Sequence, residues 1–246
     1  TYLSRILNRV PLAPCVVATL AYSVETTPAA LVATADIVGN GPGEVTLGGG
    51  TTHSNGVLSF NTQGDNARIN GIPGFNGNEA WTIAFWANHT LAPDRDMVGF
   101  DVTDKMNVRI DVWDEGTGTR FRLDAQGGDR FPLANVIDIT LGVDFHYAVV
   151  NEPGANELRL YTNGTLIETF EPSSWNLNAG GSLYLGDNPG QKNGMVGTIS
   201  GFGLYDESLP ASAFQGLQVG ERPIPEPSAF ALGALAGLGL ALRRRR

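Results

Sequence analysis

The segment 109–115 carries the side chains of this chain that are best suited to binding chemistry. It reads Arg-Ile-Asp-Val-Trp-Asp-Glu. In a β-strand alternate residues share a face, so Arg109, Asp111 and Trp113 would lie together, opposite the aliphatic residues between them. An exposed aromatic ring beside hydrogen-bonding groups can stack on a sugar ring, so the segment predicts a carbohydrate-binding surface. The alternative is that both faces of the strand are buried and Trp113 belongs to the core.

The same segment lacks the carboxylate spacing of a glycoside hydrolase. Asp111 and Glu115 would share a face but lie roughly 13 Å apart along the strand, at about 3.3 Å per residue. Hydrolases hold their two carboxyl groups about 5–5.5 Å or about 6.5–9.5 Å apart. A carboxylate on another strand, such as Asp124, could close the gap, so a hydrolase remains the alternative. We predict no catalytic residue and a non-catalytic domain.

Two loop segments offer weaker candidates. Trp175 follows Pro-Ser-Ser and could contact a ligand at the rim of the domain or simply anchor its loop. Asp187 and Asn188 begin a segment rich in carboxylate, amide and carbonyl oxygens, the ligands that Ca²⁺ prefers. One carboxylate is few for a metal site, so an ordinary hydrated turn is favoured and no cofactor is expected, with calcium as the alternative. The three histidines show no metal-ligand spacing.

Short strands must position these residues, because no long helical period occurs between positions 43 and 206. Short apolar or alternating runs are separated by Gly, Asn and Asp. The predicted strands are 57–61, 81–88, 97–101, 107–113, 120–125, 136–141, 146–150, 158–162, 165–170, 182–186 and 198–205. Asn163-Gly164 is a strong two-residue hairpin signal, and the one predicted helix is a turn or two at 210–217. The pattern predicts an all-β sandwich of two antiparallel sheets or a jelly roll.

Five motifs occur in the order typical of one family of sandwich domains. They are WTIAFW at 81–86, FHYAVV at 145–150, LRLYTNG at 158–164, LYLG at 183–186 and GTISGFGLYDESL at 197–209. In this order they resemble the laminin-G-like, concanavalin-A-like jelly-roll domains of bacterial surface proteins. The resemblance covers about residues 43–219 and implies a packed, structural role for His146. Ser200 and Gly201 stand where the family often has an acidic residue, which argues against an inherited calcium site.

The end of the sequence combines a proline motif, an apolar run and four arginines. Residues 229–242 carry no charge and would form a helix of about 21 Å, shorter than the roughly 30 Å hydrocarbon core of a membrane. The arginines would stay on the cytoplasmic side. The proline motif contains Pro225, Glu226 and Pro227, and the four arginines are Arg243, Arg244, Arg245 and Arg246.

This tail resembles the PEP-CTERM sorting signal of Gram-negative bacteria. The resemblance implies recognition of the motif 224–227 by an exosortase-type membrane protease, transient anchoring by the apolar helix 228–242, and transfer to the cell surface or extracellular matrix. The basic tail is 243–246, and the whole signal is 220–246. The alternative is a simple tail anchor that is never processed.

The other end also indicates export. Arg5 and Arg9 precede an uncharged, mostly apolar stretch, and small-x-small patterns predict cleavage by signal peptidase near residue 23 or near residue 35. The leader is therefore 1–35. Cys15 is the single cysteine and would leave with it, so the mature domain has no disulfide.

The net charge of the chain limits the kinds of molecule that it can bind. The net charge is −9, with 25 acidic against 16 basic residues, and it becomes more negative once the terminal arginines are removed. Such a surface repels phosphate backbones and excludes nucleic acid as a partner.

The sequence thus predicts one jelly-roll domain, 36–219, in an exported surface or matrix protein that binds an extracellular polysaccharide or a surface protein. Two alternatives stay open: a structural matrix protein without a specific ligand, and a glycoside hydrolase.

Overall fold

The computed structural model describes residues 30–75, 79–91, 96–101, 106–114, 119–125, 130–132, 139–171, 179–187 and 194–223. All of these belong to one compact unit, Pro28–Pro227. Residues 1–29 of the predicted leader, the sorting motif 224–227, the apolar helix 228–242 and the arginine tail lie outside the described residues, whereas residues 30–35 of the predicted leader are described. In the part of the chain that is described, no helix is long and apolar enough to cross a membrane.

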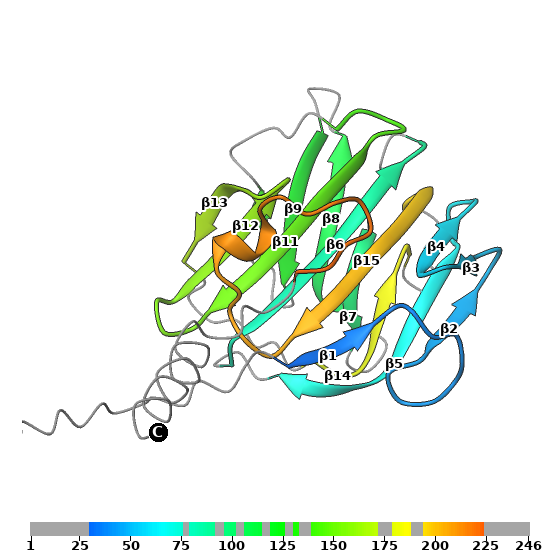
Figure 1. Ribbon diagram of the computed structural model, residues 1–246, viewed down its shortest axis with the longest axis horizontal. Helices are drawn as coiled ribbons and strands as arrows, with labels where there is room; N and C mark the ends of the chain where they lie inside the picture. The colour runs from blue at the N-terminus through cyan, green and yellow to red at the C-terminus, as the bar shows by residue number, and fades with distance from the viewer. Residues whose placement is uncertain are drawn as a thin grey trace, which may run out of the picture. The chain divides into compact units, whose positions relative to one another are not determined.

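Eight strands form the first sheet, drawn in front in Figure 1. They are β1 (Leu31–Thr34), β3 (Thr52–Ser54), β4 (Val57–Phe60), β6 (Trp81–His89), β11 (Asp144–Glu152), β12 (Glu157–Thr162), β13 (Thr165–Phe170) and β15 (Gly197–Tyr205). Their order is β13-β12-β11-β6-β15-β4-β3, and β1 also pairs with β15. Every pairing is antiparallel.

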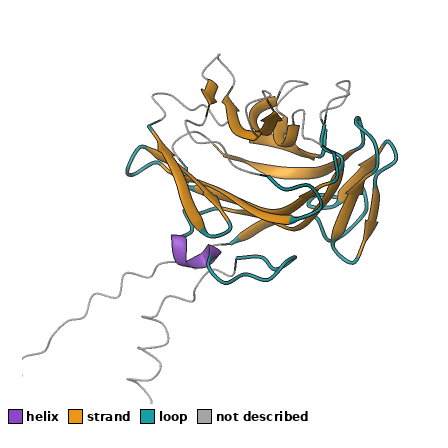
Figure 2. Ribbon diagram, turned by 90° about the horizontal axis from the view of Figure 1, so that it is seen from above, coloured by secondary structure: helices purple, strands orange, loops and turns teal. Residues whose placement is uncertain are grey.

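Seven strands form the second sheet, which lies behind the first. They are β2 (Val45–Gly48), β5 (Asn66–Phe75), β7 (Asp96–Asp101), β8 (Met106–Asp114), β9 (Thr119–Ala125), β10 (Arg130–Pro132) and β14 (Ala179–Leu185). Their order is β10-β9-β8-β7-β14-β5-β2, again antiparallel throughout. Figure 2 shows the two sheets as separate curved layers.

The main core lies between these layers because the strands alternate apolar and polar residues. The eight-stranded sheet contributes large side chains such as Phe85 and Tyr147, whose rings stack with centroids 5.5 Å apart. The seven-stranded sheet contributes smaller aliphatic residues, including Ile69, Ile110 and Leu183.

A second, smaller core covers the outer face of the eight-stranded sheet. Residues 206–223, here called the strap, follow β15 and contain the 3₁₀-helix η1 (Ala211–Phe214). Figure 2 shows this helix and the loop after it outside the sheet. Leu209, Ala213 and Phe214 pack there against the sheet residues Ala84, Ala148, Val150, Tyr161 and Tyr205. Because both of its faces are covered, β6 is a continuous buried run from Trp81 to Ala87 rather than an alternating one.

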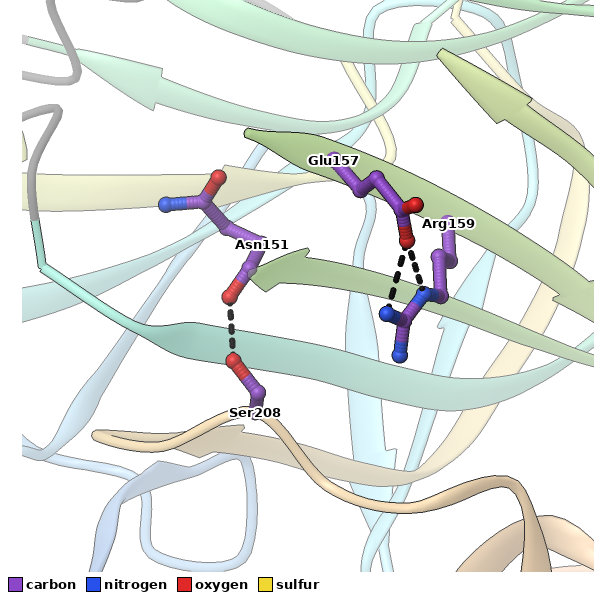
Figure 3. A network of polar contacts seen from close by, with 4 residues as sticks. All are labelled: Asn151, Glu157, Arg159 and Ser208. Carbon is purple, nitrogen blue, oxygen red and sulfur yellow. Dashed lines mark hydrogen bonds and ion pairs between the residues drawn. The ribbon is translucent and has the colours of Figure 1, made fainter. Parts of the chain in front are cut away.

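Polar contacts hold the strap at its start. The Thr82 hydroxyl donates to the Glu207 carbonyl at 2.7 Å and accepts from the Leu209 N–H at 2.9 Å. The Ser208 hydroxyl donates to the Asn151 carbonyl at 2.5 Å (Figure 3). These bonds satisfy backbone groups that the packing of the strap removes from water.

The predicted fold class, an all-β sandwich of two antiparallel sheets, is confirmed, and the Asn163-Gly164 hairpin joins β12 to β13. Both residues have positive φ angles, 48° and 76°, as a two-residue hairpin turn requires. The predicted strand 136–141 is wrong in its described part, because residues 139–140 are irregular and 141 begins a turn. The predicted helix is the single 3₁₀ turn η1.

Five strands were not predicted: β1, β2, β3, β5 and β10. Most are short, but β5 spans ten residues and pairs with both β14 and β2. Its sequence, NARINGIPGF, contains the Asn, Gly and Pro residues that usually mark turns. Gly71, with φ of 65°, sits where the pairing with β14 shifts register. A break in the ladder therefore explains a strand that carries turn residues.

Candidate functional site

The predicted binding residues Arg109, Asp111 and Trp113 all lie in β8 of the seven-stranded sheet. Ile110 between them is 1% exposed and belongs to the main core. The pleat of a strand therefore places positions 109, 111 and 113 on its other face, the outer face of the sheet. The remaining predicted ligand contact, Trp175, lies outside the described residues.

The strand pairing extends this face into a row of directly opposed positions. In strand order from β2 to β10, the row is Thr46, Arg68, Tyr184, Gly99, Arg109, Asp124 and Arg130. It crosses six inter-strand spacings of about 4.8 Å, or roughly 29 Å. Directly opposed residues share a face, so three arginine positions, an aromatic position and a glycine come together from five different strands.

At the β5–β14 end of the row the exposed Arg68 covers Tyr184 and Ser182, which are only 8% and 4% exposed. The Arg68 guanidinium lies 5.8 Å from the centre of the Tyr184 ring, within cation–π range. Its Nε donates to the Ser182 hydroxyl at 2.7 Å. On the next strand pair, the Asn70 amide donates to the Thr46 hydroxyl at 2.8 Å. These contacts fix the orientation of an exposed arginine, which lowers the entropy cost of using it in binding.

The register also decides which carboxylates face each other. Asp124, considered above as a partner for Asp111, is instead opposite Arg109. Asp111 is opposite Arg122 on β9 and opposite Asp96 on β7. Directly opposed Cα atoms lie about 4.5–5.5 Å apart in an antiparallel pair. The structure therefore makes positions 96 and 111 opposed, beside a register shift between Asp96 and Val98. The sequence analysis missed this pair because the register of two neighbouring strands cannot be read from the sequence alone.

A pocket of about 290 Å³ lies on the opposite side of the molecule, between the strap and the eight-stranded sheet. Its lining residues are Trp86 on β6, Asp144 and His146 on β11, Asn163 at the hairpin turn, and Phe214, Gly216 and Leu217 on the strap. The sequence analysis did not predict this pocket. Its only advance signals were the hairpin at 163–164 and the histidine at 146, which were interpreted as structural.

His146 is the most unusual group in this pocket. It is 1% exposed, and neither ring nitrogen has a hydrogen-bond partner. Its ring lies edge-on to Trp86, with centroids 5.1 Å apart, and 6.0 Å from the ring of Phe214. Burial lowers the pKa of His146 to about 4, so the imidazole is neutral near pH 7. One ring nitrogen then carries a proton that it could donate, and the other could accept a hydrogen bond.

The predicted calcium candidates are only partly described. Asp187 follows β14 and is 1% exposed, whereas Asn188 lies outside the described residues. Among the residues that the structure describes, no group of three or more His, Cys, Asp and Glu is arranged to hold a metal ion. Calcium binding at 187–188 therefore stays the alternative to the ordinary hydrated turn that the sequence favours.

Comparison with known families agrees with this architecture. A laminin-G-like family model, described as the concanavalin A-like lectin/glucanases superfamily, matches residues 61–213. The chain belongs to the concanavalin A-like superfamily. A second family model, the PEP-CTERM protein-sorting motif, matches residues 223–246, so this concanavalin A-like protein carries a C-terminal sorting motif of exported proteins. No curated protein sequence matches the chain.

Solved structures share the fold at low sequence identity. Domain 4 of AbnA, an extracellular arabinanase of Geobacillus stearothermophilus in complex with arabinotriose, is 17% identical, with a TM-score of 0.57 over 75% of this chain and 96% of that one. The heptameric SAP-like pentraxin of Limulus polyphemus is 15% identical, with a TM-score of 0.50 over 65% and 82%. The receptor-binding domain of botulinum neurotoxin D is 12% identical, with a TM-score of 0.54 over 69% and 45%. At these identities, the likeness establishes the concanavalin A-like fold alone.

Proposed function

We propose that this protein is an exported, non-catalytic glycan-binding protein that uses the outer face of the seven-stranded sheet. The PEP-CTERM motif implies processing by an exosortase. On our proposal, that processing delivers the domain to the cell surface or the extracellular matrix. The observation that carries the binding function is the row of opposed positions from Thr46 to Arg130.

The chemistry of the row suits an oligosaccharide. Sugars present apolar ring faces, which stack on aromatic side chains, and hydroxyl groups, which arginine and carboxylate groups bind. Trp113 is the aromatic position that we propose stacks on a sugar, because Tyr184 is only 8% exposed beneath the Arg68 guanidinium. Arg68 and Arg109 are arginine positions on either side of Tyr184 along the row. At the centre, Gly99 contributes no side chain, so a ligand can approach the backbone there. A length of roughly 29 Å accommodates a chain of sugars rather than a single one.

A related structure supports the class of ligand. Domain 4 of the arabinanase was solved with arabinotriose, an oligosaccharide, and shares this fold over most of both chains. We take this as support for glycan binding in general, and the identity of the sugar follows only from measurement.

Retention on immobilised polysaccharides tests the proposal. We expect Trp113→Ala and Arg68→Ala to elute much earlier than the unaltered protein while melting at the same temperature, because both positions lie on the outer face. The matched control is Arg159→Ala on β12 of the other sheet, an arginine that makes a 2.7 Å ion pair with Glu157 at the surface (Figure 3). Retention that survives both outer-face substitutions, or is absent from the start across the polysaccharides tested, would favour a purely structural matrix protein.

One observation favours a second candidate, a glycoside hydrolase. Asp96 and Asp111 hold directly opposed positions on neighbouring strands, and glycoside hydrolases use two nearby carboxyl groups. Release of reducing sugar from a panel of polysaccharides checks this candidate. Turnover by the unaltered protein that Asp96→Asn and Asp111→Asn each abolish would replace binding with catalysis as the function.

Sorting is tested separately. If the motif at 224–227 directs processing, Glu226→Ala should leave the protein in the membrane fraction instead of the surface or matrix fraction. A Glu221→Ala variant, altered in the strap just before the motif, is the control. An unchanged location of the Glu226 variant would show that the motif is idle in this protein.

A further inference from the structure

We propose that the pocket between the strap and the eight-stranded sheet binds a single uncharged sugar ring. This site is distinct from the proposed glycan-binding face of the seven-stranded sheet, because it lies on the outer side of the eight-stranded sheet, next to the second core. Its volume of about 290 Å³ is at the small end of ligand sites and suits one ring rather than an oligosaccharide.

Aromatic rings form one part of the pocket wall. Trp86 and Phe214 approach it from opposite sides, from the sheet and from the strap, with His146 between them. The indole N–H of Trp86 already donates to the Glu221 carbonyl at 3.0 Å. Trp86 is therefore held by the strap and offers the pocket its apolar ring surface, which is what stacking on the face of a sugar requires.

Polar groups form the other part. Asp144 accepts a hydrogen bond of 3.3 Å from the Asn88 amide through one carboxylate oxygen, and the second oxygen is available to a ligand. The Asn163 side-chain oxygen accepts a hydrogen bond of 2.9 Å from the backbone N–H of His146, which leaves the NH₂ group of the Asn163 amide as a donor. Acceptors and donors on neighbouring walls match the hydroxyl groups of a sugar, which do both.

The unpaired imidazole of His146 is the observation that points to a ligand. A polar side chain buried without a hydrogen-bond partner is destabilising, and native structures contain few of them. Both ring nitrogens are covered by neighbouring atoms, so a ligand hydroxyl would supply the missing partner once the ring turns toward the pocket that it lines. Because His146 lines the pocket with its neighbours Trp86 and Asp144, the cost would be recovered on binding.

Charge selects the kind of sugar. Among the described residues that line the pocket, Asp144 is the one acidic residue, and none is an arginine or a lysine. The imidazole of His146 is neutral. A uronic or sialic acid would therefore bring its carboxylate against Asp144 without a compensating cation, whereas an uncharged ring pays no such cost.

The strap closes the pocket, so the site exists only in the folded domain. At the hairpin turn, a side chain on Gly164 would come within 2.7 Å of the Phe214 carbonyl, so only glycine allows the strap this close. The backbone N–H of Asn163 also donates to the His146 carbonyl at 2.9 Å, which fixes the turn against β11. The turn, the strand and the strap hold the pocket walls before any ligand arrives.

Titration of the full-length protein with methyl glycosides tests the proposal. The probes are uncharged methyl glucoside, galactoside, mannoside and arabinofuranoside, with methyl glucuronide as the charged comparison, all at millimolar concentrations. The readout is the NMR resonance of the Trp86 indole N–H, assigned by its loss in Trp86→Phe. We expect at least one uncharged glycoside to shift this resonance in a saturable way and the glucuronide to leave it unchanged.

Two variants locate the binding. Asp144→Asn keeps the shape and the contact with Asn88, and we expect it to weaken the glycoside about tenfold. Leu217→Trp fills the pocket from the half-buried strap and should abolish the shift. Arg159→Ala, which is not among the residues lining the pocket, should leave it unaltered. The proposal is wrong if every uncharged glycoside leaves the Trp86 resonance unshifted, or if Asp144→Asn and Leu217→Trp bind the glycoside as the unaltered protein does. Retention on a polysaccharide gel is a separate measurement, which tests the outer face of the seven-stranded sheet.

Discussion

The hydroxyl of Tyr205, the last residue of β15, donates a hydrogen bond of 2.7 Å to the carbonyl of Pro223, the first residue matched by the sorting motif. Burial raises the pKa of Tyr205 to about 12, so this hydroxyl keeps its proton at any physiological pH. Arg222, one residue earlier, forms an ion pair with Asp36. The sorting motif therefore begins at a point where the chain is fastened to the folded domain.

Removing this fastening should loosen the strap. We expect Tyr205→Phe to lower the free energy of unfolding by about 1–2 kcal/mol, because the buried carbonyl of Pro223 loses its partner. Amide hydrogen exchange in residues 215–223 should speed up. Tyr161→Phe is the matched control, since Tyr161 packs on Phe214 without a described hydrogen bond. Equal urea denaturation curves for Tyr205→Phe and the unaltered protein would contradict this role.

Two buried histidines should make the domain sensitive to mild acid. Burial lowers the pKa of both His89 and His146 to about 4, below the value of about 6.5 in the unfolded chain. The unfolded state thus binds more protons between about pH 6.5 and about pH 4. Stability is complete above this window and falls on acidification by about 1.4 kcal/mol per pH unit for each histidine.

Urea unfolding at about pH 7 and about pH 5 measures this loss. The loss of unfolding free energy per pH unit should fall to about half in His146→Asn, because this variant removes one of the two buried histidines. A free energy of unfolding that is the same at both pH values would show that the histidines are not buried as described.

Asp65 should act as a clamp between two loops. Burial alone would raise its pKa, but hydrogen bonds from the N–H groups of Gly50, Thr62 and Asn61 and from the Thr62 hydroxyl outweigh this and lower the pKa. The stability it contributes is present above about pH 4 and is lost as the pH falls further. We expect Asp65→Ala to cost about 2–4 kcal/mol, since several donors lose one acceptor.

Thermal melting of this variant checks the estimate. Asp65→Asn is informative beside it, because the amide keeps one acceptor oxygen but has no charge. Its melting temperature should lie between those of the unaltered protein and Asp65→Ala. A melting temperature of Asp65→Ala within a degree or so of the unaltered protein would refute the clamp.

If a leader is removed as predicted, the position of β1 favours one of the two predicted cleavage sites. Leu31, Ala33 and Thr34 pair with Tyr205, Leu204 and Gly203 of β15, and Ala33 and Ala35 are buried. Cleavage near residue 35 would delete this strand, at a cost of at least about 2 kcal/mol from lost burial and pairing. We therefore expect the mature protein to begin near residue 23, which mass spectrometry of its first peptide checks. A mature protein that starts at residue 36 with undiminished stability would show that β1 is dispensable.

Much of the fold was legible in the sequence because its signals are local. Alternation and the Asn163-Gly164 turn depend on neighbouring residues, and they correctly placed most of the long strands. The β5 strand escaped because its Gly71 and Asn70 are turn formers that the pairing with β14 overrides. Local preference is weak beside the burial of a strand between two partners.

The sequence by itself determined the sandwich, the sorting motif and the shared face of Arg109, Asp111 and Trp113, because each rests on residue order alone. Only the tertiary structure decided which strands lie side by side. It set Asp96 rather than Asp124 opposite Asp111, aligned Arg68 and Tyr184 with Arg109, and built the pocket around His146. Strand register and the path of the strap are settled by packing between segments far apart in sequence, and no local pattern encodes them.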